Sequence, residues 1–149
     1  MKTSIYILVF LFSISLSGQS LKKLLKKHNT ESVAYISVEM TKANPNYVLL
    51  DARELKEYKV SHLKNAIHVG YKAFNLKETI SKLTNKDATI VVYCSLGIRS
   101  EDIAEKLQKS GYKKVYNLYG GIFEWKNNGN VVFDTQNNPT NKVHAFNKE

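Results

Sequence analysis

Apolar runs and amphipathic stretches alternate along the chain, and this alternation predicts its secondary structure. Continuous apolar runs bounded by turn residues are typical of buried strands, whereas apolar positions three and four residues apart are typical of helices. We expect strands at residues 33–36, 47–50, 67–70, 88–93 and 113–118 and helices at 38–42, 71–83, 101–109 and 122–127, with a helical turn at 53–58. This order predicts an α/β domain with a mainly parallel central sheet flanked by helices on both faces.

Several element ends carry residues suited to caps and tight turns. Ser37 is expected to cap the helix at 38–42, and Ser100 the helix that follows the strand at 88–93. Gly111 suits the end of that second helix. Gly120 and Gly121 suggest either positive φ or a close approach of two backbones.

Cys94 is the only cysteine, and it lies between the strand at 88–93 and the helix that follows. The carboxyl end of a strand is where open α/β sheets bind ligands. Gly97 allows the loop to curl so that its N–H groups point inward, and Arg99 adds a positive charge near a helix N-terminus. Such surroundings favour a thiolate, so we interpret Cys94 as an activated nucleophile. A buried structural cysteine is the alternative.

The residues around the cysteine resemble the active-site loop of the rhodanese (sulfurtransferase) family, Cys-Arg-x-Gly-x-Arg-Ser/Thr. They are Cys94, Ser95, Leu96, Gly97, Ile98, Arg99 and Ser100. Two further segments match in order. Residues 49–58 resemble the family's Leu-Asp-Val-Arg-x-x-x-Glu-Tyr motif, and residues 116–125 resemble its later strand, double glycine and Trp-bearing helix.

The resemblance covers roughly residues 32–132 and implies a rhodanese-like fold. It further implies that Cys94 takes a sulfane sulfur from a donor as a persulfide and passes it to a thiol or cyanide. The loop residues Ser95 to Ser100 would then bind the substrate. The family often has arginine where this chain has Ser95. We therefore expect thiosulfate to be a poorer donor than a polysulfide, a persulfide or a protein partner.

Two other functions stay open at this point. Related cysteine phosphatases and arsenate reductases use a similar loop with five residues between Cys and Arg, whereas four residues separate Cys94 from Arg99. The other alternative is a non-enzymatic docking or sulfur-carrier module, because a fold alone does not determine function.

Four polar residues outside the loop are weighed as further site candidates. Asp51 and Arg53 are expected to form a salt bridge that fixes the end of a strand rather than to act in catalysis. His62 is expected to stabilise a turn, beside an Asn65 that tolerates positive φ. His144 could reach the chemistry, although nothing in the sequence places it near Cys94. The histidines and carboxylates show no zinc-like spacing, so we expect no metal and no cofactor.

The N-terminal residues 1–20 have the features of a cleaved secretory signal peptide. Lys2 precedes an apolar stretch of about a dozen residues, too short for a comfortable membrane span, and small residues follow it. We therefore expect an exported protein, periplasmic or secreted, with no stable membrane span after cleavage; an uncleaved anchor is the alternative. We interpret residues 21–31 as a short basic amphipathic lead-in and residues 133–149 as a C-terminal tail. Residues 131–133, where the domain meets the tail, could add a small strand.

The length and charge of the chain indicate its number of domains and its kinds of partner. The 149 residues suit one domain, and 22 Lys and Arg against 13 Asp and Glu give a net charge of +9. The lysines are scattered, which indicates a solubilising surface, and no basic run is interleaved with aromatics, so we expect no nucleic-acid binding. The expected partners are a small sulfur donor and a thiol or cyanide acceptor, with a periplasmic protein partner also considered.

Overall fold

The computed structural model describes residues 18–145, which fall into two units divided after Thr30. In the first unit, residues 18–28 form one helix, which includes most of the predicted basic amphipathic segment. The predicted signal peptide lies largely outside the described residues. No helix within residues 18–145 has the length and apolar character needed to cross a membrane.

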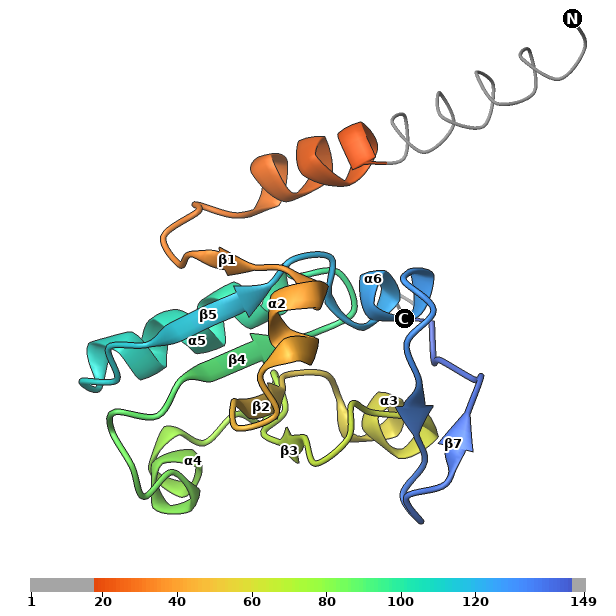
Figure 1. The fold of residues 1–149 in the computed structure, drawn as a ribbon. Coiled ribbons are helices and arrows are strands. Elements are labelled where there is room, and N and C mark those ends of the chain that lie inside the picture. The colour runs from red at the N-terminus through yellow and green to blue at the C-terminus, as the bar shows by residue number, and fades with distance from the viewer. Residues whose placement is uncertain (1–17, 146–149) are drawn as a thin grey trace, which may run out of the picture. The chain divides into compact units, whose positions relative to one another are not determined.

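The second unit is built on a five-stranded sheet in which every neighbouring pair of strands is parallel. Its strands lie in the order β1-β5-β4-β2-β3 (Figure 1). The bounds are β1 Tyr35–Ile36, β2 Val48–Asp51, β3 Ile67–His68, β4 Ile90–Tyr93 and β5 Val115–Leu118. The predicted α/β architecture is therefore confirmed, with β4 as the central strand.

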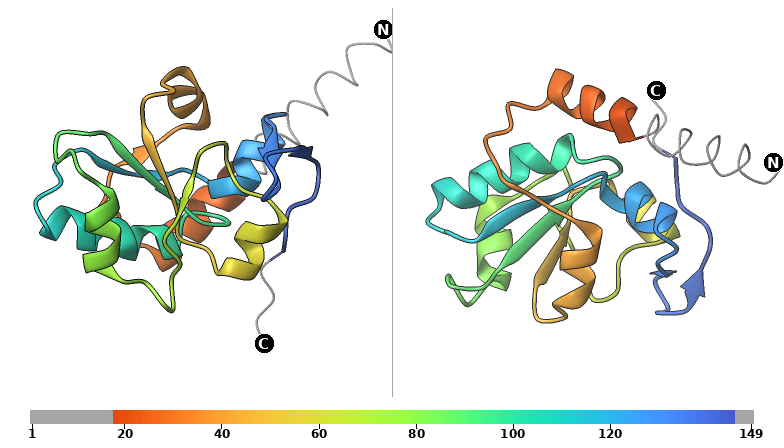
Figure 2. Two further views of the ribbon diagram at one scale, coloured as in Figure 1. Left: turned by 90° about the horizontal axis from the view of Figure 1, so that it is seen from below. Right: turned by 45° about the horizontal axis from the view of Figure 1, so that its top comes forward.

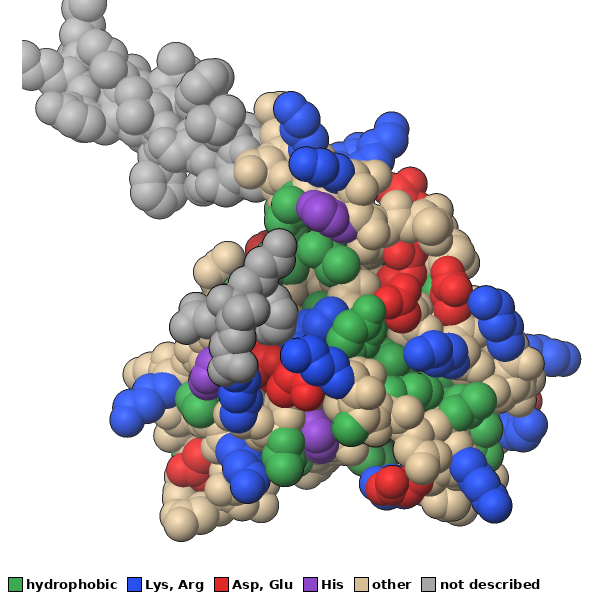
Figure 3. All heavy atoms as spheres, turned by 180° about the vertical axis from the view of Figure 1, so that it is seen from behind, with side chains coloured by type: hydrophobic (Ala, Val, Ile, Leu, Met, Phe, Trp, Pro, Cys, Tyr) green, Lys and Arg blue, Asp and Glu red, His purple; other side chains and the backbone are tan. Residues whose placement is uncertain are grey.

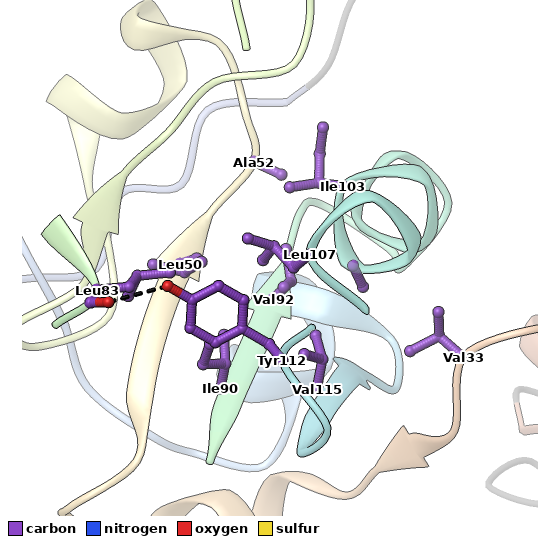
Figure 4. Close-up of a cluster of buried hydrophobic side chains, with 11 residues drawn as sticks. Val33, Leu50, Ala52, Leu83, Ile90, Val92, Ile103, Leu107, Tyr112 and Val115 are labelled. Carbon is purple, nitrogen blue, oxygen red and sulfur yellow. Dashed lines mark hydrogen bonds between the residues drawn. The ribbon is translucent and has the colours of Figure 1, made fainter. Parts of the chain in front are cut away.

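Helices cover both faces of this sheet (Figure 2). They are α2 Val38–Ala43, α3 Leu55–Val60, α4 Leu76–Lys82, α5 Arg99–Lys109 and α6 Gly121–Asn127. Side chains of β4 alternate between two cores, as the two-residue period of a strand requires. Ile90 and Val92 pack with α5 in the cluster drawn in Figure 4, whereas Val91 and Tyr93 pack with α2 and α6.

One predicted helix is much shorter than expected, and one predicted cap is wrong. Residues 71–75 form turns, and α4 begins only after Asn75, whose side chain accepts the Glu78 N–H as an N-cap. Ser100 does not cap α5. The helix already begins at Arg99, so the Ser100 hydroxyl lies inside its first turn and faces the preceding loop.

The other predictions on caps and positive-φ positions are confirmed. Ser37 caps α2 by accepting the Met40 N–H at 3.2 Å. Gly111, just after α5, has a φ of +95°. Gly120 and Gly121 have φ values of +71° and +57°, and Asn65 one of +60°.

The C-terminal region holds a small second sheet. The predicted strand at residues 131–133 is present as β6, Val132–Phe133, and it pairs antiparallel with β7, Pro139–Thr140, which the sequence did not suggest. Trp125 packs against one of the two cores but is only partly buried. Figure 3 shows lysine and arginine side chains spread among acidic and uncharged ones on the face it presents.

Candidate active site

The loop after β4 places Cys94 at the carboxyl edge of the sheet, next to the start of α5. Residues 94–98 form this loop, and only 1% of the Cys94 surface is exposed. Because β4 is the central strand, neighbouring strands flank its carboxyl end on both sides. The cysteine thus lies where sheets of this type bind ligands.

Hydrogen-bond donors from the same loop and the first turn of α5 face the Cys94 sulfur. The Gly97 amide donates to Sγ at 3.1 Å, and the Ser100 hydroxyl lies 3.5 Å from it. Gly97 has a φ of +105°, a conformation that residues with side chains rarely adopt. Preorganised hydrogen-bond donors stabilise negative charge on the atom that they surround, so this loop suits an anionic sulfur.

Asn117 on β5 orients both of these donors. Its Nδ2 donates to the Gly97 carbonyl at 2.8 Å, and its Oδ1 accepts the Ser100 hydroxyl at 2.7 Å. Ser100 has a single hydroxyl proton, which here goes to the shorter contact with Asn117. The same proton lies within reach of Sγ, so Ser100 can turn it to the sulfur when the sulfur carries charge.

The N-terminus of α6 holds the loop backbone from the other side. The Cys94 carbonyl accepts the Ile122 N–H at 2.9 Å, and the Ser95 carbonyl accepts the Phe123 N–H at 3.2 Å. Gly121 makes this approach possible, because a Cβ at that position would lie 2.3 Å from the Cys94 carbonyl oxygen. The expectation of a close backbone approach at the double glycine is therefore confirmed.

Arg99 does not extend freely toward the sulfur but forms a two-pronged ion pair with Glu57. Its Nη1 and Nη2 each donate to one Glu57 carboxylate oxygen at 2.8 Å, and the Glu57 side chain is fully buried. Ser95 completes the cluster: its Oγ accepts from Arg99 Nη2 at 3.0 Å and donates to Glu57 at 3.2 Å. The positive charge that we assigned to the loop is thus largely balanced inside the protein.

The electrostatics of this cluster follow from its burial and its pairing. Burial alone would raise the pKa of Glu57, but hydrogen bonds from Arg99 and the Glu54 backbone, with the charges of Arg99 and Arg53, lower that pKa below its ordinary value of 4.5. Burial would lower the pKa of Arg99, and the Glu57 hydrogen bond, with the charges of Cys94 and Glu57, raises it instead. Both partners of the pair are therefore charged at neutral pH.

Asp51 and Arg53 form a second buried pair that supports the site from β2. Arg53 Nη2 lies 2.6 Å from Asp51 Oδ2 and also donates to the Ser61 carbonyl, and both side chains are fully buried. These contacts join the end of β2 to the segment after α3. The expected salt bridge is present, in the structural position predicted for it.

A protein-family model matches most of the chain. The family model described as "Rhodanese-like domain" matches residues 17–128. The chain belongs to the rhodanese-like family. Residues 49–58 and 94–100, which carried the resemblance in the sequence, both lie inside the matched region.

Relatives of this rhodanese-like chain include proteins of different lengths. Thiosulfate sulfurtransferase GlpE of Coxiella burnetii is 34% identical over 79 residues, which cover 53% of this chain and 71% of that protein. The tRNA uridine(34) hydroxylase of Photorhabdus laumondii is 38% identical over 87 residues, which cover 55% of this chain. This chain spans only 24% of the hydroxylase's length.

Solved structures agree on the fold. A rhodanese-related protein from Thermoplasma volcanium superposes with a TM-score of 0.58 at 28% identity, covering 66% of this chain and 96% of that one. Thiosulfate sulfurtransferase from Pseudomonas aeruginosa gives a TM-score of 0.62 at 22% identity, covering 77% of this chain and 22% of that one. The second likeness concerns the fold alone.

Three residues of this rhodanese-like site were missed in the sequence. Glu57 falls within the motif at residues 49–58, Asn117 within a predicted strand and Tyr71 within a predicted helix, and none of these patterns indicates a role at the site. A lone asparagine inside the apolar strand Val115–Leu118 is the one signal that could have indicated a buried polar contact.

Tyr71 lies at the rim of the site. Its hydroxyl donates to Asp102 Oδ2 at 2.6 Å, which ties the segment after β3 to the first turn of α5. This hydrogen bond, followed by burial and the charges of Asp102 and Cys94, raises the pKa of Tyr71 despite the opposing charge of Arg99. Tyr71 therefore stays neutral at physiological pH, with its hydroxyl proton held by Asp102.

The histidines lie apart from the sulfur. The His62 ring stacks on Tyr58 with centroids 4.1 Å apart, and its backbone N–H bonds the Phe133 carbonyl. His62 therefore joins the end of α3 to β6, a longer-range contact than the turn predicted for it. Among the described residues, no contact joins the partly buried His144 to Cys94, and its Nδ1 has no hydrogen-bond partner. Within residues 18–145, no group of three or more His, Cys, Asp or Glu side chains could hold a metal ion.

The Glu57–Arg99 pair predicts a specific pH dependence of stability. Because folding lowers the pKa of Glu57, its contribution is present above pH 4.5 and is lost as the pH falls through the lower folded-state pKa. Glu57→Gln should lower the free energy of unfolding by about 2 kcal/mol at pH 7, since it removes the buried carboxylate that both Nη atoms of Arg99 bond. Urea denaturation at pH 7 and at progressively lower pH should show this gap closing below pH 4.5.

The matched control is Glu78→Gln. Glu78 also pairs with a cation, Lys82, but both side chains are exposed, so its removal should change stability little at any pH. A gap between the wild type and Glu57→Gln that stays constant with pH would contradict the assignment.

Proposed function

We propose that this rhodanese-like domain is a sulfurtransferase that carries a sulfane sulfur as a persulfide on Cys94. The observation that carries the proposal is the sulfur's surroundings: the Gly97 N–H donates to Sγ, and the Ser100 hydroxyl lies within reach. Such donors suit a sulfur that is anionic both as thiolate and as persulfide. The name of the GlpE relative, a thiosulfate sulfurtransferase, supports the same chemistry.

The proposed reaction has two displacement steps on sulfur. The Cys94 thiolate attacks the sulfane sulfur of the donor; the donor's S–S bond breaks, and its electron pair leaves with the remaining thiolate, or with sulfite when the donor is thiosulfate. An acceptor thiolate or cyanide then attacks the outer sulfur of the persulfide. The bond between the two sulfurs on Cys94 breaks, and its electron pair restores the Cys94 thiolate. No external oxidant or reductant is needed.

The charges around the loop favour a donor other than thiosulfate. Thiosulfate is a dianion whose oxygens need a positive side chain, and the family often supplies an arginine where this chain has Ser95. Here both Nη atoms of Arg99 are engaged by Glu57, and Ser95 is part of the same cluster. We propose a polysulfide or an organic persulfide as the donor, because neither needs an oxyanion contact.

A comparison of donors tests this choice. With cyanide as acceptor, kcat/KM for thiocyanate formation should be at least about tenfold higher with inorganic polysulfide than with thiosulfate. A factor of about ten corresponds to the one charged hydrogen bond to thiosulfate that this site lacks. Cys94→Ser, which lacks the nucleophile, corrects for the direct reaction of polysulfide with cyanide. Equal or greater efficiency with thiosulfate would contradict the donor assignment while leaving the sulfurtransferase proposal in place.

A sulfur-carrier module is a second candidate, favoured by the burial of the sulfur. With 1% of its surface exposed, Cys94 is shielded from cyanide and small thiols in solution. A persulfide that forms on Cys94 but passes to neither cyanide nor a small thiol would identify a carrier that needs a protein partner. A phosphatase role is disfavoured, because Arg99 is held by Glu57 rather than directed at a substrate anion.

We also propose that the domain acts outside the cytoplasm. The support is the sequence pattern of Lys2 followed by the apolar stretch 5–12. Expression in a bacterial host with fractionation and intact-mass measurement tests this. A cytoplasmic protein of full-length mass would contradict it.

A further inference from the structure

We infer that the domain has a second binding site, for a small organic anion with an aromatic body, in a cavity away from Cys94. The cavity has a volume of about 370 Å³ and is lined by residues from the end of α2, the start of β2, α6 and the segment around β6. None of its lining residues belongs to the Cys94 loop. The inference is independent of the proposed sulfur transfer.

Three aromatic side chains give the cavity its apolar character. Tyr47 directly precedes β2, Trp125 lies on α6 and Phe133 on β6, and all three are only partly buried. The Trp125 indole N–H donates to the Val131 carbonyl at 2.9 Å, which satisfies the ring's polar atom and fixes its position. A held, partly exposed set of rings is typical of a ligand pocket, and the volume is near the lower end for such sites, enough for one or two fused rings.

The charge of the lining selects an anion. Lys42 and Lys64 are the charged residues of the lining, which contains no aspartate or glutamate. Both lysines are exposed, and within residues 18–145 neither forms an ion pair with a carboxylate. The Lys64 ammonium lies 5.7 Å from the centroid of the Phe133 ring, so it is held over the aromatic wall. An aromatic wall with the Lys64 ammonium held over it and a second lysine, Lys42, in the lining matches an aromatic carboxylate.

Trp125 provides a direct measurement, because it is the only tryptophan in the chain. In the NMR spectrum of the ¹⁵N-labelled full chain, its indole N–H gives a single identifiable signal. Titration with 2-naphthoate should shift this signal saturably, together with the backbone amides of Val131 and Phe133. The neutral 2-naphthamide, of the same shape, should bind more weakly.

Charge variants complete the test. The double variant Lys42→Gln/Lys64→Gln should raise the dissociation constant of 2-naphthoate about tenfold. Each exposed lysine contributes only a small factor, because ion pairs at exposed sites are weak. Lys77→Gln is the matched control: Lys77 is an exposed lysine of α4, whose apolar residues pack against the other core, and its loss should leave binding unchanged.

Two results would overturn the inference. One is the absence of a saturable shift of the Trp125 indole signal. The other is binding that 2-naphthamide reproduces and that the lysine substitutions leave unchanged, since this would show apolar adsorption without anion selection. Neither result bears on sulfur transfer, which is measured separately at Cys94.

Discussion

Cys94→Ser is expected to abolish sulfur transfer, lowering thiocyanate formation by at least about 1,000-fold. A serine hydroxyl cannot hold a sulfane sulfur as a persulfide. The fold should be retained, because the smaller hydroxyl can still accept the Gly97 N–H that now bonds Sγ. Thiocyanate release measures activity, and the thermal unfolding midpoint controls for stability.

The single cysteine makes this test unambiguous. The chain offers no second thiol that could replace Cys94 or carry the sulfur in its absence. Transfer at the wild-type rate in a folded Cys94→Ser variant would remove the nucleophile assignment altogether.

Gly121→Ala should damage both activity and stability, because it forces the loop and α6 apart. The new Cβ would lie 2.3 Å from the Cys94 carbonyl oxygen, and the φ of +57° adds strain. We expect a loss of about 2–4 kcal/mol in the free energy of unfolding, from positive φ and overpacking together. Activity should fall about 100-fold in the fraction that stays folded, since a misplaced nucleophile reacts poorly.

Gly129→Ala is the matched control for the backbone strain. Gly129 also has a positive φ, +72°, but a Cβ there would meet nothing within 4 Å. It should therefore lose only about 1–2 kcal/mol and keep wild-type kcat. If the two alanine variants behaved alike in kcat, the contact between α6 and the Cys94 loop would not be what positions the nucleophile.

The order of strands and helices was predictable because each element carries its own local pattern. The apolar run ending at Tyr93 and the amphipathic helix after it place Cys94 correctly between them. The first residue of a helix was harder to predict than the presence of the helix. Asn75 begins α4 later than the apolar pattern suggested, and α5 begins early enough to draw Ser100 into its first turn.

The support of the site could not be predicted from local pattern, because it depends on pairs far apart in the sequence. Glu57 and Arg99 are 42 residues apart, and Ser100 and Asn117 are 17 apart. Their pairing is decided by which strands neighbour β4, and the sequence alone does not give that order. The loop residues were identifiable, but the neutralisation of Arg99 by Glu57 was not, and it changes which donor the site suits.

We expect the Gly97 N–H and the Ser100 hydroxyl, rather than a free arginine, to stabilise the sulfur. Arg99 has a structural task, since it keeps the buried Glu57 carboxylate paired and so holds Ser95 in place. The loop is then supported on three sides, by α6, by Asn117 and by this ion pair. Each support acts on a different atom of the loop and can be removed separately.

The most direct test of the central claim is the intact mass of the protein after incubation with polysulfide or, separately, with thiosulfate. We expect a gain of one sulfur atom on Cys94, larger with polysulfide, which cyanide removes with release of thiocyanate. Folded protein with a free Cys94 thiol that gains no sulfur from either donor would contradict the persulfide mechanism.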